Sequence, residues 1–420
     1  MPVRQNIFLL AIYIFIIFLF FPSWQALNFF STVLLVITAF FQNSFKEKLA
    51  VLRERKFTYG ILLFFIYIFI SVLTSDNRVN AFQSLDPRLP LLYFPISIGL
   101  VNTDKAVSQK ALTGIAVIIT IVSLVCVTNG IYRATHFHNT SYLYNDALSE
   151  SVTGLQSIYI SLLVNISIFI FTWLYISRPQ TPGRSLFIPA IIFLFITSFL
   201  LASRNLMLGL YAATLIFAFY HIIKKRKYLE GATLIFGLII SLFITFKFFP
   251  KTMNRFKELS YTSFNFQQDG AESHYDMSVD STQWNGANSR RAIWQCGWEL
   301  FRQYPVFGVH LGDKKDKLTA IYREKKFDFA LRTQKNLHNN YLDILVSLGI
   351  SGFILFISSW IIIPLFYFRK KNDILSLSIL LTFAMAMATE NYFDRSLGGM
   401  LFGFFVSFLL SSNLSKNEPM

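Results

Sequence analysis

Residues 337–343 read LHNNYLD and run into a long apolar segment that contains LGISG at 348–352. This stretch lies where the chain's only long polar segment, residues 250–340, returns to apolar sequence. A histidine and two amides therefore stand at the start of a segment long enough to cross a membrane. Gly349 and Gly352 lack side chains that would hold a neighbouring helix away, so close packing is expected there. This pattern suits chemistry at the boundary between lipid and water.

The composition is that of an integral membrane protein. Apolar residues make up 54% of the 420, 47 residues are phenylalanine, and the mean hydropathy is +0.49, which is far outside the range of soluble proteins. A helix that spans a bilayer needs about 20 mostly apolar residues, so we count about twelve transmembrane helices and predict an all-α polytopic membrane protein. The predicted spans cover residues 7–21, 25–42, 57–74, 89–101, 111–129, 155–176, 186–201, 206–223, 229–249, 341–368, 374–390 and 396–412.

The long polar segment divides the chain. Residues 1–249 are expected to hold transmembrane helices 1–9, and residues 250–340 a large periplasmic loop with short amphipathic helices. Residues 341–420 are expected to hold transmembrane helices 10–12 and a cytoplasmic C-terminus. No small-residue cleavage site follows residues 7–21, so we expect this segment to remain as the first span.

The distribution of positive charge predicts the orientation. One set of short loops, with the two termini, carries 18 basic residues: Arg4, Lys46, Lys48, Arg53, Arg55, Lys56, Lys105, Lys110, Arg178, Arg184, Lys224, Lys225, Arg226, Lys227, Arg369, Lys370, Lys371 and Lys416. The opposite short loops carry only Arg78, Arg88, Arg133, Arg204 and Arg395. The positive-inside rule then places both termini in the cytoplasm and the large loop outside. The net charge of +15 is mostly a topology signal, and no nucleic-acid partner is predicted.

Neither the cysteines nor the histidines predict a metal or redox site. Cys126 lies inside a predicted span and Cys296 in the outer loop, so a disulfide between them is not expected. His136 and His138 are the nearest approach to a pair of metal ligands, but no cysteine or carboxylate stands at a suitable spacing. We therefore expect no metal and no cofactor.

The outer loop contains one clear amphipathic helix, predicted over residues 288–304. Arg290 and Arg291 fall in its first turn, while Trp294, Trp298 and Phe301 share one face. That aromatic face either lies in the outer leaflet or packs on other protein, and the sequence leaves both open. Residues 261–286 read as irregular and mobile. The basic stretch 314–335 is expected to be mostly a solvated helical face, which would also guide an anionic substrate.

Arginines on the outer side are unexpected under the positive-inside rule. Any single one is explained equally well by contact with lipid headgroups. Several together are harder to explain that way, because guanidinium groups match phosphate oxygens with two parallel hydrogen bonds. Arg88, Arg204 and Arg290, with Arg395 as a further member, are therefore candidates to bind a lipid-linked diphosphate.

These residues together resemble the O-antigen ligase/polymerase superfamily of bacterial membrane glycosyltransferases. The resemblance covers the architecture of most of the chain, and its motifs lie mainly in the second half. They are Ser203-Arg204; Arg290 with Trp294, Pro305 and Gly308; and His338-Asn339 with Tyr341, Leu342, Gly349 and Gly352. Two departures stand out. Gln156 occupies a position where many relatives carry histidine, and the doubled Arg290-Arg291 leaves the register of that arginine open.

The resemblance implies a metal-independent enzyme of the bacterial inner membrane whose active site faces the periplasm. Its donor would be a polyprenyl-diphosphate-linked glycan. His338 would serve as the catalytic base or position the acceptor, and the arginines would bind the diphosphate. Supporting roles are expected for Arg291, Asn339, Tyr341, Glu390 and Arg395. From the residues alone, Glu390 either orients the base or binds a sugar hydroxyl, or it pairs with Arg395, and the sequence leaves these alternatives open. Independently of the resemblance, displacing a diphosphate from a sugar requires a base for the acceptor hydroxyl and positive charge for the leaving group.

The leading prediction for function is an O-antigen ligase that transfers a preassembled glycan to the lipid A core. Polymerisation of O-antigen, or transfer to protein, would use the same donor and differ only in the acceptor. A membrane solute transporter is the most distant alternative. It would predict an internal repeat and ionisable residues at mid-membrane, neither of which is evident. Besides donor and acceptor, membrane lipids are the expected partners.

Overall fold

The computed structural model describes residues 2–177, 181–223, 226–248, 256–268, 270, 283–412 and 414. Within these ranges the regular structure is helical, and no strand is present. In chain order the α-helices are α1 (Pro2–Leu19), α2 (Gln25–Phe40), α3 (Phe45–Glu54), α4 (Phe57–Thr74), α5 (Arg78–Leu85), α6 (Pro90–Ser97), α7 (Lys105–His136), α8 (Asn145–Thr153), α9 (Ser157–Ser177), α10 (Phe187–Leu201), α11 (Arg204–Ile223), α12 (Tyr228–Phe248), α14 (Asn288–Gln303), α15 (Lys314–Glu324), α16 (Asp328–Arg332), α17 (Asn340–Phe356), α18 (Ile363–Lys370), α19 (Ile374–Met387) and α20 (Ser396–Ser411). Short helical turns precede or join several of them: η1 (Asp86–Arg88), η2 (Thr140–Leu143), η3 (Arg184–Leu186), η4 (Glu258–Ser260), η5 (Ile357–Ile362) and η6 (Tyr392–Asp394).

The all-helical membrane class is confirmed, but the number of spans is not. Among the described residues, five helical segments are long and apolar enough to cross a membrane: Phe57–Thr74, Lys105–His136, Ser157–Ser177, Arg184–Leu201 and Asn340–Lys370. The pair α2 and α3, bent by 88°, makes a sixth if it is counted as one span. Five further apolar helices of 10–17 residues are shorter than a full crossing. The protein is therefore a multi-pass membrane protein, and the predicted count of twelve is not confirmed.

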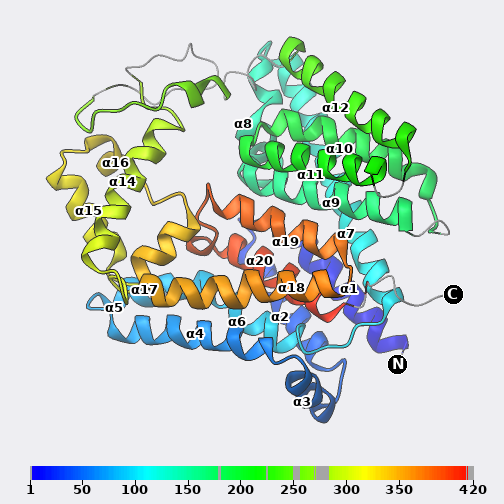
Figure 1. The fold of residues 1–420 in the computed structure, drawn as a ribbon, viewed down its shortest axis with the longest axis horizontal. Coiled ribbons are helices and arrows are strands. Elements are labelled where there is room, and N and C mark those ends of the chain that lie inside the picture. Colours follow the sequence, from blue (N-terminus) through cyan, green and yellow to red (C-terminus); the bar gives the residue numbers. More distant parts are fainter. Residues whose placement is uncertain are drawn as a thin grey trace.

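One end of the bundle gathers segments that the charge pattern assigned to the cytoplasm. The contacts that join them are Gln5 Nε2 to Asp104 Oδ2 (2.6 Å), Arg55 Nη1 to the Gly99 carbonyl (2.8 Å), Thr103 N to the Ser411 carbonyl (3.1 Å), Gln109 Nε2 to Thr181 Oγ1 (3.0 Å) and the rings of Phe57 and Tyr367 (5.1 Å between centroids). Arg178, Lys224, Lys225 and Lys416 lie outside the described residues. The helices α14, α15 and α16 stand at the opposite end, on the left of Figure 1, beyond the ends of α4 and α17.

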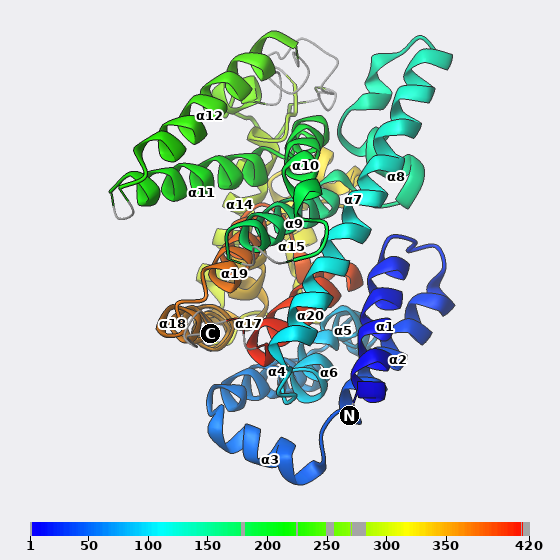
Figure 2. The ribbon, with the colours of Figure 1, turned by 90° about the vertical axis from the view of Figure 1, so that its right-hand side faces the viewer.

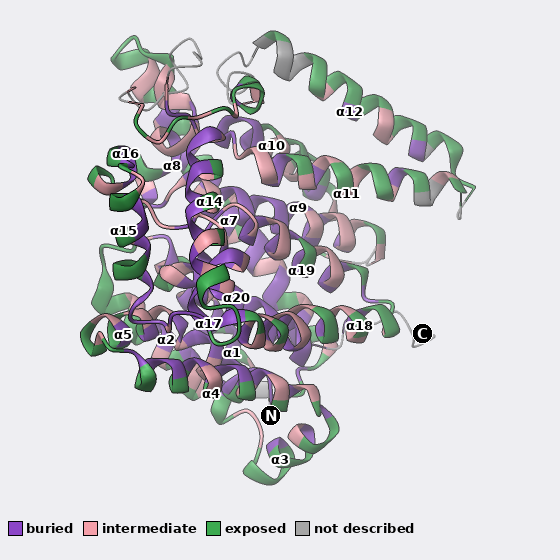
Figure 3. Cartoon of the chain, turned by 60° about the vertical axis from the view of Figure 1, so that its left-hand side comes forward, coloured by how far each residue is buried: buried purple, intermediate pink, exposed green. Residues whose placement is uncertain are grey.

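The most buried helices are α9 and α20, which run through the middle of the bundle. Both are apolar on all sides, as expected of helices surrounded by other helices. Phenylalanine rings make much of this core; Phe404, for example, packs on Phe15 and Phe94. Figure 3 shows the buried centre, with α3 and α12 more exposed. In Figure 2, α11 and α12 lie side by side at one edge.

The outer loop has a small core of its own. Trp284, Cys296 and Phe327 are buried in it together with apolar residues of α14, α15 and α16. Helix α14 buries the face that carries Ala292, Ile293, Cys296 and Leu300 and packs on α17. Of the predicted aromatic face, Trp294 is partly buried, whereas Trp298 is 49% exposed. The face of α14 that packs on protein is thus the one with Ala292, Ile293, Cys296 and Leu300, while the predicted aromatic face stays partly exposed at Trp298. The segment 261–286 is described only at 261–268, 270 and 283–286.

The loop is joined to the bundle where α17 is kinked. Gly349 has non-helical angles (φ 67°, ψ −172°), and residues 305–309 cross α17 at this break. The Ile350 amide donates to the Pro305 carbonyl (2.9 Å), and the Val309 amide donates to the Val346 carbonyl (2.9 Å). Gly308 also has positive φ (72°), and a Cβ added to it would lie 2.5 Å from the carbonyl carbon of Ser347. Two motif segments that are distant in sequence thus form a single backbone crossing.

Replacing either crossing glycine should destabilise the protein. Gly308→Ala and Gly349→Ala each place a Cβ against backbone atoms at a positive φ, which costs about 1–3 kcal/mol for the backbone conformation alone. We expect a lower thermal-unfolding midpoint for both variants in detergent. The control is Gly237→Ala in α12, where an added Cβ meets nothing within 4 Å. Unchanged midpoints for both crossing variants would contradict this account of the kink.

Reporter fusions test the predicted orientation. A phosphatase fused after Lys227 should be inactive because that loop is expected in the cytoplasm, whereas a fusion within residues 265–285 should be active. Activity is read in intact cells, with fusion protein levels as the control. The reverse pattern would invert the topology and move the site to the cytoplasm.

Candidate active site

Two segments meet beside the start of α17 and form paired contacts. His338 Nδ1 lies 3.3 Å from Glu390 Oε2, and the Asn339 amide donates to Asn391 Oδ1 at 2.7 Å. Asn339 is also the N-cap of α17, since its side-chain oxygen accepts from the amides of Tyr341 (3.0 Å) and Leu342. Segment 338–339 is thus held against segment 390–391, which follows α19.

His338 is held by its backbone as well as by its ring. Its φ of 45° lies in the left-handed region, which a non-glycine residue adopts at some cost in energy, so surrounding contacts must fix it. The His338 amide donates to Asn336 Oδ1 (3.1 Å), and Trp294 Nε1 of α14 donates to the Leu337 carbonyl (2.8 Å). The His338 side chain is 24% exposed, which leaves its ring accessible. Tyr341 joins α17 to α19 through a hydrogen bond from its hydroxyl to the Ala384 carbonyl (2.6 Å).

Glu390 is a buried carboxylate that remains ionised. Burial by itself would raise its pKa, but the hydrogen bond and charge of His338, with the charges of Arg290 and Arg395, outweigh burial and lower the pKa of Glu390 below its usual value. Within the described part of the chain, its Oε1 atom accepts no hydrogen bond. Glu390 is therefore placed to orient His338 and to stabilise the protonated imidazole.

Arg204 and Arg290 converge although they come from different parts of the fold. Arg204 begins α11 after a tight turn at Ala202 (φ 50°), and its Nη1 lies 3.1 Å from Glu258 Oε2. Arg290 lies in the first turn of α14 and donates to the Gly286 carbonyl (3.0 Å). A Cβ added to Gly286 would lie 2.7 Å from Arg204 Nη2 and 3.5 Å from Arg290 Nη1. Both guanidinium groups therefore stand at the same glycine.

The turn that carries Arg204 is also tied to the segment that carries Glu390. Asn205 Nδ2 donates to Thr389 Oγ1 (3.2 Å) and to the Met385 carbonyl. Arg290 meets Arg204 at Gly286, and the Arg204 turn is hydrogen-bonded to Thr389 beside Glu390, so the two arginines and the His338–Glu390 pair lie at the same end of the bundle. The charge of Arg290 also lowers the pKa of Glu390.

The structure distinguishes the two adjacent arginines. Arg290 is partly buried, whereas Arg291 is exposed and reaches Thr262 Oγ1 (3.3 Å). This favours Arg290 as the member that belongs to the site. Arg395 is exposed near Glu390, and its Nη1 donates to Gln156 Oε1 (2.8 Å). The residue at the departure from the family pattern, Gln156, is thus a partner of a candidate site residue.

Arg88 lies deeper than the sequence predicted. It is 3% exposed, its Nη1 donates to the Ser84 carbonyl (2.6 Å), and its Nη2 lies 3.0 Å from Asp394 Oδ1 and 3.4 Å from Asp343 Oδ2. Lys314 joins the same network, with its Nζ 2.6 Å from Asp343 Oδ1 and 2.8 Å from Asp394 Oδ1. Arg88 thus has two carboxylate partners, and the structure does not bring it to Gly286 with the other arginines.

Sequence reasoning missed the members of this network other than Arg88. Lys314 was expected on a solvated face and is buried, so that expectation is wrong for this residue. Burial by itself would lower the pKa of Lys314, but the charges of Asp343 and Asp394 raise it overall. The charges of Lys314 and Arg88 keep the pKa of Asp394 below its usual value in spite of burial. The one available signal was an aspartate, Asp343, at the start of an otherwise apolar span.

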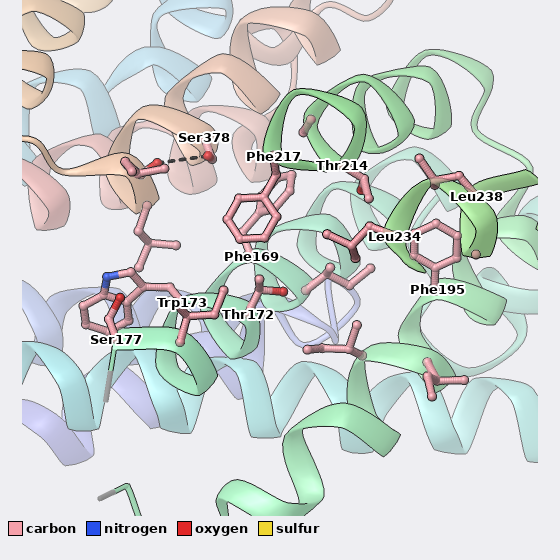
Figure 4. A pocket seen from close by; sticks show the side chains of 18 of the residues that line it. Phe169, Thr172, Trp173, Ser177, Phe195, Thr214, Phe217, Leu234, Leu238 and Ser378 are labelled. Atoms are coloured by element: carbon pink, nitrogen blue, oxygen red, sulfur yellow. Dashed lines mark hydrogen bonds between the residues drawn. The ribbon is translucent and has the colours of Figure 1, made fainter. Parts of the chain in front are cut away.

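An apolar cavity of about 680 Å³ lies elsewhere, between α9, α10, α11, α12 and α19. Figure 4 shows Trp173, Phe195, Phe217 and Leu238 among its lining residues. None of the candidate site residues lines it. Its wall on α10 reaches Phe199, near the turn that precedes Arg204. Among the described residues, no group of three or more histidine, cysteine or acidic side chains is arranged to bind a metal.

The fold and the site define a multi-pass membrane protein with a histidine–carboxylate pair and converging arginines at one end of its bundle. Residues 189–357, which contain Arg204, Arg290 and His338, match the family model described as O-antigen ligase. This match over part of the chain confirms the resemblance seen in its motifs. It supports a membrane glycosyltransferase of the O-antigen ligase/polymerase type, a class that acts on a lipid-linked glycan and an acceptor. No curated protein matches the chain.

The lowered pKa of Glu390 predicts how acid affects stability. Its ionised form stabilises the folded protein, and this contribution is present above the unfolded value of about 4.3 and is lost as the pH falls through the lower folded value. Between pH 6 and pH 3 the unfolding midpoint of the wild type should therefore fall more than that of Glu390→Gln. Glu324→Gln, which alters an exposed carboxylate of α15, should keep the wild-type slope. Equal slopes for wild type and Glu390→Gln would contradict an ionised buried carboxylate at Glu390.

Proposed function

We propose that the protein is an O-antigen ligase that transfers a preassembled glycan from a polyprenyl diphosphate to the lipid A core oligosaccharide. The reaction would take place at the periplasmic face of the bacterial inner membrane. The observation that carries this proposal is the convergence of Arg204 and Arg290 at Gly286, in one cluster with the His338–Glu390 pair. This transfer requires a base that accepts the proton of the acceptor hydroxyl and positive charge that stabilises the diphosphate leaving group. His338 would supply the first, and the two arginines the second.

His338 is the proposed base. Because its Nδ1 faces the ionised Glu390, the neutral ring would carry its proton on Nδ1 and present the lone pair of Nε2. The acceptor hydroxyl oxygen attacks the anomeric carbon and its proton passes to Nε2. The bond between the anomeric carbon and the diphosphate oxygen breaks, and its electron pair leaves with the diphosphate. Glu390 then stabilises the imidazolium without taking the proton, as the acid of a catalytic triad does.

Arg204 and Arg290 are the proposed diphosphate ligands. A guanidinium group donates two parallel hydrogen bonds to phosphate oxygens, and Arg204 already holds a carboxylate, Glu258, at 3.1 Å. Fixed positive charge beside the departing oxygen stabilises the negative charge that develops there. Arg395, exposed beside Glu390, would add to this charge, while Arg291 would contribute less.

The remaining candidates have supporting roles in this proposal. Asn339 caps α17 and Tyr341 ties it to α19, so both would hold His338 in place. We assign Arg88 to the buried carboxylates instead of the diphosphate, because it has two carboxylate partners and does not meet Arg204 and Arg290 at Gly286. The apolar cavity that reaches Phe199 offers room for hydrocarbon near the Arg204 turn, which favours a lipid-linked donor.

Transfer by purified protein tests the proposal. With a polyprenyl-diphosphate-linked glycan and lipid A core in nanodiscs, His338→Ala should lower the transfer rate by about 10²–10⁴-fold, the usual contribution of a positioned base. Arg204→Lys and Arg290→Ala should each lower the transfer rate by roughly 10²-fold. The lysine keeps the positive charge but loses the paired hydrogen bonds, and the alanine loses both. The measurement is glycan attached to the core, per amount of folded protein.

Arg291→Ala is the matched control, since it removes an exposed arginine next to Arg290. It should retain most of the wild-type rate. Near-normal transfer by folded His338→Ala would remove the base from the mechanism, and near-normal transfer by both arginine variants would remove the diphosphate ligands. Products elongated on the lipid carrier, with no transfer to core, would make the protein a polymerase.

A further inference from the structure

The buried charges beneath the site join four separate parts of the chain. Arg88 comes from η1, Lys314 from the start of α15, Asp343 from the first turn of α17 and Asp394 from η6. The network contains two cations and two carboxylates, so its formal charges balance. Its Arg88 and Asp343 side chains are only 4% and 2% exposed. Such a set is stable only when complete, because loss of one member leaves a buried charge without compensation.

Asn391 connects this network to the candidate catalytic pair. Its Nδ2 donates to Asp343 Oδ1 and to Asp394 Oδ2, both at 3.0 Å, while its Oδ1 accepts from the Asn339 amide at 2.7 Å. The side chain is fully buried and engaged at both ends. Its orientation is therefore set by the two carboxylates.

Each residue that Asn391 joins is next to a member of the catalytic pair. Asn339 follows His338, and Asn391 follows Glu390, so the Asn339–Asn391 contact lies beside the His338–Glu390 contact. These two adjacent contacts, together with the Phe393 amide that donates to Asn340 Oδ1 (3.1 Å), fix the relative position of the two segments, and the Asn339–Asn391 contact is the one next to His338. The second contact depends on Asn391, and hence on the charge balance around Asp343 and Asp394.

Lys314 links this arrangement to the outer loop. The residue before it, Asp313, accepts from the amides of Asp76 (3.0 Å) and Asn77 (2.8 Å), which lie between α4 and α5. Two consecutive residues at the start of α15 thus bind the bundle, one through its carboxylate and the next through its ammonium group. Docking of the loop places the cation that completes the network.

We propose that Lys314 and Asn391 are positioning residues that hold His338 against Glu390. Lys314 balances the negative charge of Asp343 and Asp394, and Asn391 donates hydrogen bonds to both carboxylates. The catalytic consequence rests on the proposed function, but the positioning itself does not. Loss of either residue should slow the transfer step and leave the affinity for the donor, which depends on Arg204 and Arg290, nearly unchanged.

Charge-balanced variants test this. Lys314→Met should lower kcat per folded protein at least 10-fold, with the donor KM within about 3-fold of wild type. The double variant Lys314→Met with Asp394→Asn retains one cation and one carboxylate and should recover kcat to within about 3-fold. Asn391→Ala should lower kcat in the same way. The control is Lys315→Met, an exposed lysine next in α15, which should behave as wild type.

A second measurement does not require transfer activity. Diethylpyrocarbonate reacts with neutral imidazole, so the rate of modification of His338, followed by peptide mass spectrometry, reports how the ring is held by Glu390. Lys314→Met and Asn391→Ala should raise this rate at least 3-fold, and the double variant should restore it. The exposed His136 in the same samples is the internal standard.

The outcomes separate the two proposals. Absence of wild-type transfer, with His338 reactivity changing as expected, would refute the proposed function and retain the positioning role. Normal kcat and unchanged His338 reactivity in Asn391→Ala would overturn the positioning role. So would a double variant that folds but recovers neither kcat nor protection of His338, because the lysine would then act by something other than charge balance.

Discussion

A carboxylate buried in the first turn of an apolar helix governs the arrangement at the end of the bundle where the candidate site lies. Asp343 is 1% exposed, and a charge in such surroundings is tolerated only with close partners of opposite sign. Its partners come from η1 and from the outer loop, and both also bind Asp394. Pairing this one charge therefore requires the loop, the η1 turn and the segment after α19 to meet at the start of α17.

The same meeting assembles the candidate active site. His338 and Asn339 precede α17, Glu390 and Asn391 follow α19, Arg204 begins α11, and Arg290 lies on α14. No single helix carries more than a part of the site. The backbone crossing at Gly349 and the ion network around Asp343 both attach the loop to α17, one through glycines that permit close approach and the other through charge.

The protein contains two different environments. Its large apolar cavity lies among α9 to α12 and α19 and is lined by none of the candidate site residues. The candidate site residues His338, Glu390, Arg204 and Arg290 gather at one end of the bundle, where His338 keeps access to solvent. The donor in the proposed reaction, a glycan on a lipid diphosphate, also combines two kinds of group. Its hydrocarbon chain matches the apolar cavity, and its diphosphate and sugar match the charged site.

The sequence by itself determined the membrane class, the helical character and the motifs that resemble the O-antigen ligase family. It also predicted the sidedness of the basic loops and the roles of His338, Arg204 and Arg290. These features are local: apolar runs, loop charges and short motifs are read without knowing how the helices pack. Tertiary structure alone decided that Glu390 partners His338, that Arg290 and not Arg291 turns inward, that Lys314 is buried and that Arg88 joins a carboxylate network. Those outcomes depend on contacts between residues 29 to 306 positions apart. The sequence alone does not reveal whether a charged side chain at a helix end contacts a carboxylate, a phosphate or water. Its partner is decided by how the chain packs.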